Sequence, residues 1–268
     1  MATVNSILIV GCGNMAGAML QGWLAGGLAP ARFTVVDPVA RDLPAGVRSL
    51  AALPAGEVFD AILLGIKPQL LAEVAPQVAP LAARATVVIS ILAGVELAVL
   101  RGYFAEAGLL RLMPNLSAAL GKSPMALAAD GLDADGRGAV VELLAPLGTP
   151  EWVAEDAFDL VTALAGSGPA FVYRFIDALA QGAADLGLPA DEARRLALAT
   201  VDGAAALAAA SPYDPAELAR RVASPGGVTQ AGLDALDHNG SLRRVIAQTL
   251  RAARDRSAQM AAEARGKG

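Results

Sequence analysis

Cysteine and histidine are almost missing from this sequence, since Cys12 and His238 are the only examples in 268 residues. A single cysteine excludes an internal disulfide framework and is typical of a reducing compartment, so we expect a cytoplasmic protein. The two residues cannot supply the four ligands of a structural zinc site, and no metal is expected. No Ser/His/Asp pattern accompanies either residue, so we interpret Cys12 as a turn filler and His238 as a surface or capping residue.

Charge is scarce as well. Charged residues make up 18% of the chain, the formal net charge is −5, and the 21 lysines and arginines are scattered. Without a basic stripe to neutralise phosphates, nucleic acid is not an expected partner. No charge precedes Arg32, yet a signal peptide would need a basic start, and glycines interrupt any apolar run long enough to cross a membrane. We therefore expect no membrane association.

Hydrophobic residues account for 55% of the sequence, which excludes a disordered chain. In the first part, short runs rich in Ile, Leu and Val alternate with segments of helical length, as is typical of parallel strands buried on both faces. The runs are Ser6–Val10, Phe33–Val36, Ala61–Gly65, Thr86–Ser90, Leu109–Met113 and Met125–Ala128. The alternation predicts a doubly wound α/β domain over residues 1–155.

Beyond Trp152 the strand-like runs stop, and alanine-rich segments of helical period follow. The segments are Gly168–Leu186, Ala190–Ala210, Pro215–Val222, Thr229–Leu236 and Ser241–Ala264. Their small side chains favour close helix–helix contacts. We expect an all-helical second domain over residues 156–268, so the predicted fold class is α/β plus all-α.

The first predicted strand runs into a G-x-G-x-x-A motif that opens a predicted helix. The candidate cofactor-binding residues in it are Gly11, Gly13, Asn14, Met15 and Ala16. Gly11 permits a tight turn, Gly13 leaves room for backbone to approach a pyrophosphate, and Ala16 allows close helix–sheet packing. The helix N-terminus adds unpaired N–H donors. The same spacing occurs in structural turns, but its place between a strand and a helix favours a dinucleotide site.

The end of the second predicted strand bears on which dinucleotide binds. Asp37 stands there, where an acidic residue commonly binds the adenosine ribose hydroxyls and favours NAD, although a simple turn residue before Pro38 is the alternative. Arg41 lies four residues further on and could pair with the 2′-phosphate of NADP. The choice between NAD(H) and NADP(H) stays open at this point.

A third segment of the predicted cofactor site follows the strand that ends near Gly65. It consists of Gly65, Ile66, Lys67 and Pro68. Backbone here lies at the carboxyl edge of the sheet, where ligands bind in such folds. The alternative for Lys67 is an ordinary surface lysine in a loop.

Two glycine-rich turns open helices in the second part of the chain. Their residues are Ser167 and Gly168 in the first turn, and Ser224, Gly226, Gly227, Val228 and Thr229 in the second. Backbone N–H groups at a helix start form a natural anion site. Ser167 is equally well explained as a helix N-cap. The two successive glycines in the second turn favour close approach of a ligand, because an ordinary cap needs only one permissive residue.

Taken together, the motifs resemble the pyrroline-5-carboxylate reductase family, from Ile7 to about Ala262. The matching segments, in the family's order, are Gly11–Ala16, Gly65–Gln69, Ser90–Val95, Arg111–Asn115, Gly166–Ala170, Gly187–Pro189 and Ser224–Thr229. The sequence departs from the usual family residues at Ala165, at Phe171 and at Leu116-Ser117. These departures remove a hydroxyl or two near the cleft, but they leave the backbone anion sites in place.

The resemblance implies an NADP(H)-dependent oxidoreductase, with NAD(H) as an alternative cofactor. Hydride would pass to the C=N bond of 1-pyrroline-5-carboxylate and give L-proline, the last step of proline biosynthesis. The implied fold is a Rossmann domain followed by a helical domain that forms a dimer or a higher homo-oligomer.

The resemblance also implies roles for particular residues. The carboxylate of the substrate would lie on the N–H groups of Gly227, Val228 and Thr229. Thr229 would be the catalytic residue, with its hydroxyl near the ring nitrogen. The implied substrate site includes Ser167, Gly168, Ser224 and Gly226, and the implied cofactor site includes Ala93 and Gly94.

Two other readings remain. A related two-domain imine reductase or 3-hydroxyacid dehydrogenase is one, but such enzymes commonly use a lysine in the helical domain, and no lysine occurs from Leu132 to Gly266. A non-catalytic NAD(P)-binding regulator is the other. A regulator would have no need of the second anion site at the turn before Thr229.

Overall fold

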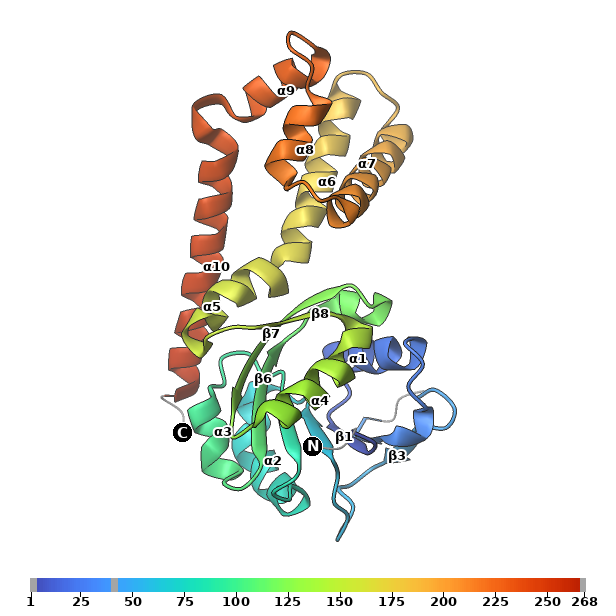
Figure 1. Cartoon of the computed structure of the whole chain (residues 1–268), viewed down its shortest axis with the longest axis vertical. Helices are drawn as coiled ribbons and strands as arrows, with labels where there is room; N and C mark the ends of the chain where they lie inside the picture. The colour runs from blue at the N-terminus through green and yellow to red at the C-terminus, as the bar shows by residue number, and fades with distance from the viewer. Residues whose placement is uncertain (1–3, 40–42, 266–268) are drawn as a thin grey trace. The chain divides into compact units, whose positions relative to one another are not determined.

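The computed structural model describes residues 4–39 and 43–265 of the chain. Two compact units emerge from it, one made of Met1–Ser167 with Ala252–Gly268 and the other of Gly168–Arg251. Figure 1 shows a sheet with surrounding helices in the first unit and helices alone in the second.

The first unit is built on an eight-stranded sheet in the order β3-β2-β1-β4-β5-β6-β7-β8. Its strands are β1 (Ile7–Val10), β2 (Phe33–Val36), β3 (Arg48–Leu50), β4 (Ala61–Leu64), β5 (Val87–Ser90), β6 (Gly108–Met113), β7 (Ser123–Asp130) and β8 (Gly148–Trp152). All neighbouring pairs are parallel except β6 and β7, which are antiparallel. The order reverses beside β1, so the carboxyl ends of β1 and β4 form a topological switch point, where ligands bind in open α/β sheets.

Burial explains why the central strands are continuous apolar runs. Ile7 and Ile9 of β1 face one hydrophobic cluster, while Leu8 and Val10 face the other. Helices cover both faces: α1 (Asn14–Ala25) and α4 (Ala134–Leu144) contribute to the first cluster, and α2 (Leu71–Val78), α3 (Leu97–Tyr103) and α5 (Phe158–Val161) contribute to the second. Such double covering is the physical origin of the unalternating strand sequences.

The second unit contains α6 (Gly168–Asp185), α7 (Ala190–Ala210), α8 (Pro215–Val222) and α9 (Val228–Leu236). It also holds the start of α10 (Ser241–Arg265), whose last turns belong to the first unit. Gly187, at φ +104°, allows the tight connection between α6 and α7. Small side chains line the contact, since Ala180, Ala193 and Ala197 are buried there. In the described part of the chain, no single helix is long and apolar enough to cross a membrane, and only α7 with α8, bent by 119°, meet that test together.

Candidate functional site

The turn after β1 is interlocked with the turn after β4. Gly11 adopts φ +82°, a left-handed conformation that favours glycine. Its N–H donates to the carbonyl of Val36 (2.8 Å), while the N–H of Gly65 donates to the carbonyl of Val10 (2.8 Å). A Cβ on Gly65 would collide with the carbonyl oxygen of Gly11 and would lie 2.8 Å from the Cβ of Ala16. The structure thus brings three of the predicted cofactor residues into direct contact.

The N-terminus of α1 is open and has no cap from a side chain. Gly13 is the N-cap, with extended backbone, no side-chain hydrogen bond at this end and no acidic residue in the first turn. A Cβ on Gly13 would meet no atom within 4 Å. The first-turn N–H groups, which include those of Asn14, Met15 and Ala16, have no partner within the helix. A helix start of this kind attracts a negatively charged group such as a pyrophosphate.

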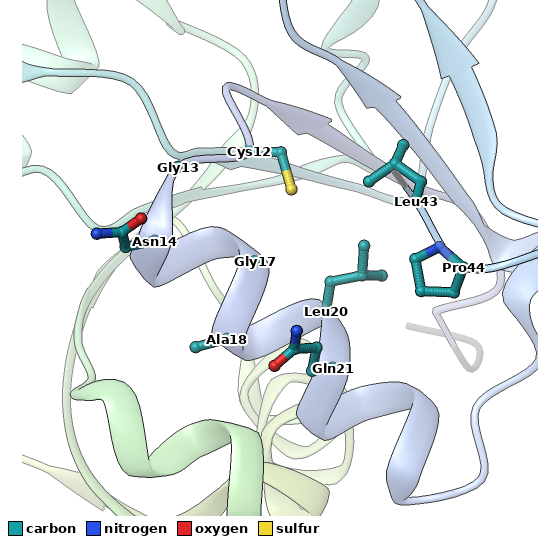
Figure 2. Close-up of a pocket in the computed structure, with 9 residues that line it drawn as sticks. All are labelled: Cys12, Gly13, Asn14, Gly17, Ala18, Leu20, Gln21, Leu43 and Pro44. Carbon is teal, nitrogen blue, oxygen red and sulfur yellow. The ribbon is translucent and has the colours of Figure 1, made fainter. Parts of the chain in front are cut away.

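A cavity of about 490 Å³ lies beside this helix start. Figure 2 shows the side chain of Cys12 next to the helix start, with Leu43 and Pro44 across from Leu20 of α1. The residues that line the cavity are Cys12, Gly13, Asn14, Gly17, Ala18, Leu20, Gln21, Leu43 and Pro44. None of these side chains carries a charge. An uncharged cavity with both polar and apolar lining residues, next to backbone donors, is suited to a dinucleotide, which combines flat rings with phosphates.

Asp37 connects the end of β2 to the glycine turn. Its Oδ2 accepts the N–H of Cys12 (2.7 Å), and its Oδ1 accepts the N–H of Val39 (2.9 Å). The carboxylate is therefore fixed directly beside the G-x-G turn. Arg41, the other predicted determinant of cofactor choice, lies outside the described residues.

The remaining predicted cofactor residues occupy two other loops of the same unit. Ile66 lies against Gly11, Lys67 is exposed, and Pro68 begins a short 3₁₀ turn, Pro68–Leu70, that precedes α2. In the loop after β5, Ala93 is exposed, whereas Gly94 (φ +75°) is buried against the backbone of Ala261 in α10. A Cβ on Gly94 would lie 3.2 Å from the Cα of Ala261, so α10 covers this glycine.

The connection into the second unit contains Ser167. Five residues, Thr162–Gly166, form a π-helical turn, and the Ser167 N–H donates to the carbonyl of Thr162 (2.9 Å). The Nδ2 of Asn115, after β6, donates to the carbonyl of Ala165 (2.9 Å) and so fastens this turn. Asn115 ends the Arg111–Asn115 motif but is not one of the predicted site residues. Gly168, the next predicted residue, is the first of α6.

The other glycine-rich turn, Ser224–Thr229, lies entirely within the second unit. Gly226 adopts φ +71°, and the N–H of Gly227 donates to the carbonyl of Ser224 (2.9 Å). A Cβ on Gly227 would collide with the Ser224 hydroxyl. Gly227 is the N-cap of α9 and no side chain caps this end, while Val228 and Thr229 are exposed. The turn therefore presents a second uncapped helix N-terminus, the arrangement that binds a carboxylate.

His238 and Cys12, which were expected to have no chemical role, lie outside any cluster of metal-binding side chains among the described residues. His238 is exposed in a 3₁₀ turn, His238–Gly240, and its Nε2 lies 2.9 Å from the Nδ2 of Asn239. Cys12 is buried. Among the described residues, no group of three or more His, Cys, Asp or Glu side chains could hold a metal ion.

Comparison with known proteins identifies the family. A family model described as pyrroline-5-carboxylate reductase dimerisation matches residues 155–260, and one described as NADP oxidoreductase, coenzyme F420-dependent, matches residues 6–94. A pyrroline-5-carboxylate reductase of Pseudomonas aeruginosa is 35% identical over 264 residues, which cover 95% of this chain and 96% of that protein. The chain belongs to the pyrroline-5-carboxylate reductase family. This membership confirms the resemblance read from the motifs and the predicted oxidoreductase class.

Further reductases agree with this assignment. The pyrroline-5-carboxylate reductase of Glycine max is 34% identical, with 94% of each chain covered. The solved pyrroline-5-carboxylate reductase of Coxiella burnetii is 28% identical and has a TM-score of 0.89, with 96% of this chain and 98% of that chain covered. The enzyme of Plasmodium falciparum, solved with NADP bound, has a TM-score of 0.83 at 23% identity and so shows the same fold. The predicted combination of a Rossmann-type sheet with a helical region is confirmed.

Proposed function

We propose that this reductase transfers hydride from NADP(H) or NAD(H) to the C=N bond of 1-pyrroline-5-carboxylate and produces L-proline. One observation carries the proposal: each unit has a helix N-terminus capped by glycine and by no side chain, at Gly13 and at Gly227. A dinucleotide and a carboxylate-bearing imine are two anionic ligands. The reaction of the family would transfer hydride from the dinucleotide to the imine.

The residues of the first unit fit a nicotinamide dinucleotide. The open space at Gly13, the free first turn of α1 and the uncharged cavity beside it would hold the pyrophosphate and the adenosine half. The carboxyl ends of β4 and β5, with Gly65 and Ala93, would contact the rest of the molecule. When bound, the cofactor supplies the hydride.

The turn before α9 fits the substrate carboxylate. Backbone N–H groups of Gly227, Val228 and Thr229 are the donors, and the Ser224 hydroxyl leaves no room for a side chain at Gly227. The Thr229 hydroxyl would hold the ring nitrogen. A protonated imine is already electrophilic, so the chain's task is to orient the substrate and exclude water, which by itself lowers the barrier by several kcal/mol.

The proposed function also includes a homo-oligomer and a cytoplasmic location. The helical unit leaves many large apolar side chains exposed, and its match to a dimerisation family supports a homo-oligomer in which a second copy covers them. The subunit number, a dimer or a higher assembly, belongs to the proposal. The single cysteine fits a reducing compartment, and we place the enzyme in the cytoplasm.

A cofactor-consumption assay tests the function. Purified protein is given NADPH or NADH with pyrroline-5-carboxylate, with 3-hydroxyisobutyrate or with no substrate, and proline is measured as product. We expect oxidation of the cofactor with the imine alone, together with an equal amount of proline. Absence of imine turnover with both cofactors would refute the proposal, and turnover of the hydroxyacid would favour the dehydrogenase alternative.

A further inference from the structure

The loop between β5 and α3 is a tight turn at the carboxyl edge of the sheet. The N–H of Val95 donates to the carbonyl of Leu92 (3.3 Å), and Gly94 between them has φ +75°, which glycine adopts without strain. Ala93 is exposed in the middle of the turn. Because Ala93 is exposed, its position depends on the contacts that hold the rest of the loop.

A buried ion pair is linked to both ends of this loop. Arg111 of β6 is 5% exposed, and its register partner on β5 is Ser90, the residue that precedes the loop. Its Nη1 donates to Oε1 of Glu155 (3.1 Å), and the same oxygen accepts the N–H of Leu97, where α3 begins (2.7 Å). The guanidinium carbon also lies 4.4 Å from the centroid of the Phe158 ring.

Stability alone does not explain a charge at this position. Arg111 lies among apolar residues of the cluster that covers this face of the sheet. Replacing a buried ion pair by apolar side chains of similar volume is often neutral or even stabilising, because desolvation offsets the attraction between the charges. What the pair adds here is direction, since it fixes the N–H of Leu97 and therefore the end of the loop.

The last turns of α10 contact the middle of the same loop. A Cβ on Gly94 would lie 3.2 Å from the Cα of Ala261, which is 4% exposed. The hydroxyl of Ser257, about one turn earlier, donates to Oδ1 of Asp159 in α5 (2.7 Å), and Figure 1 shows α5 alongside this part of α10. Asp159 directly follows Phe158, whose ring contacts the buried arginine. All of these residues belong to the first unit.

We propose that Arg111, Glu155 and Ser257 are positioning residues, which hold the loop after β5 so that Ala93 contacts the nicotinamide half of the cofactor. The inference rests on the proposed function, because that function places the cofactor at the carboxyl edge of the sheet. The start of α1 would hold the pyrophosphate and adenosine half independently of this loop. A looser loop therefore weakens the contact with the nicotinamide half alone.

Calorimetric titration with two ligands tests this inference. NADPH contains the nicotinamide, and 2′-phospho-ADP-ribose is the same molecule without it. Ser257→Ala removes the hydrogen bond to Asp159 and should weaken NADPH binding by about two- to tenfold, which is the range that one hydrogen bond contributes. Binding of the fragment should stay within about twofold of the wild type.

Two further substitutions on α10 are the controls. Ser257→Thr keeps the hydroxyl and should restore most of the affinity for NADPH. Thr249→Ala removes a hydroxyl of the same helix that bonds to the carbonyl of Val245 within that helix (2.9 Å), so it should leave both affinities unchanged. Partial unfolding lowers the apparent affinity for both ligands equally, so a loss for NADPH alone is not an effect of stability.

The ion pair is tested in the same way with Glu155→Ala and Glu155→Gln. Glu155→Ala removes the acceptor of the Leu97 N–H and should weaken binding of NADPH but not of the fragment. Glu155→Gln keeps an oxygen at this place and should retain most of the affinity. Thermal melting of the cofactor-free proteins shows which variants are folded. If Glu155→Ala does not fold, the Ser257 variants decide.

Three results would overturn the inference. The first is unchanged NADPH binding in folded Ser257→Ala and Glu155→Ala. The second is an equal loss of affinity for NADPH and for the fragment. The third is a wild type that binds NADPH no more tightly than the fragment, since the loop would then hold no contact with the nicotinamide. Absence of imine turnover in a wild type that binds NADPH refutes the proposed reaction alone, and the titrations still decide the role of the loop.

Discussion

Glycine has two different physical purposes in the nucleotide turns. At Gly65 the neighbouring atoms leave no space for a Cβ, because the carbonyl of Gly11 and the side chain of Ala16 already occupy it. At Gly13 the space is empty, and the backbone conformation, φ −68°, is one that alanine adopts easily. Gly65 is therefore required by the folded chain itself, whereas nothing in the folded chain requires Gly13, and we attribute this glycine to the proposed pyrophosphate site.

This difference predicts opposite outcomes for two alanine substitutions. Gly65→Ala should separate the two turns and lower the unfolding free energy by about 1–3 kcal/mol, as overpacking typically does. Gly13→Ala should leave the melting temperature nearly unchanged but raise the KM for the cofactor, because the new methyl group lies in the path of the pyrophosphate. Thermal melting of the cofactor-free protein and steady-state kinetics separate the two effects. An equal loss of stability in both variants would contradict the assignment.

Substitution of Thr229 tests the proposed role of its hydroxyl in substrate binding. Its hydroxyl is expected to hold the imine nitrogen, while the carboxylate would be held by backbone donors that no side-chain substitution removes. We predict that Thr229→Ala lowers kcat/KM by roughly 10–100-fold, the cost of one hydrogen bond to a charged group, without abolishing activity. Thr229→Ser, which keeps the hydroxyl, should recover most of the loss. Complete inactivity of a folded Thr229→Ala protein would instead show that Thr229 is an essential proton donor.

Sequence patterns located the glycine turns because each of them is a local feature. The positive φ of Gly11 and Gly226 and the small residue at Ala16 are needs of the adjacent backbone, so they are visible in a short motif. Asn115 is different, since its hydrogen bond to Ala165 spans 50 residues. Only the folded chain brings these two together, and no local rule could select Asn115 for this role.

At the scale of elements, Asp60 joins the starts of β1 and β4. Its Oδ2 accepts the N–H of Asn5 (2.8 Å), the N–H of Ser6 (2.9 Å) and the Ser6 hydroxyl (3.1 Å). Burial alone would raise the pKa of this carboxyl, but these hydrogen bonds and the charge of Arg32 lower it further than burial raises it, so the net pKa is lowered. The folded state therefore favours ionised Asp60.

A lowered pKa in the folded state fixes the sign of the pH dependence. The stabilisation from Asp60 is fully present above the pKa of an unfolded aspartate, about 3.9, and is lost as the pH falls through the lower folded value. Asp60→Asn should cost about 1–2 kcal/mol at neutral pH, and its difference from wild type should shrink in strong acid. Urea unfolding across pH measures this. Asp177→Asn, which breaks only an exposed ion pair with Arg174, should change little at any pH. A constant cost of Asp60→Asn at every pH would contradict the account.

The two edge strands show where element prediction from sequence fails. β3 has three residues, two of them exposed, and β8 includes Gly148 and Pro150 within five residues. Neither forms the continuous apolar run that marked the central strands, because an edge strand needs partners on one side only. β3 pairs with β2 and β8 pairs with β7, and these pairings depend on the neighbouring strand rather than on a local apolar pattern. The central strands were predictable because they are buried on both faces, which makes each of them a continuous apolar run.

At the scale of the whole molecule, the 55% hydrophobic content is divided unequally. The first unit buries its apolar residues in two clusters on either side of the sheet. In the helical unit only a few alanines are fully buried among the described residues, and Val172, Phe175 and Leu179 of α6 are exposed in one row. A row of exposed apolar side chains on one helix face is typical of an interaction surface. The family resemblance implied a homo-oligomer, but the sequence did not show which face of the helical unit carries the exposed apolar side chains.

A charge placed in this row should therefore dissociate the homo-oligomer. Phe175 is 47% exposed in the single chain, and Phe175→Glu would bury an unpaired carboxylate at an interface between copies. We predict a smaller mass by sedimentation, a lower melting temperature and loss of the rise in melting temperature with protein concentration that an oligomer shows. Arg174→Ala, one residue away on a side chain that is 84% exposed, is the matched control and should keep the wild-type mass. A Phe175→Glu protein of unchanged mass would place the subunit contact on another face of the helical unit, and Val228, 94% exposed at the start of α9, would be the next position to test.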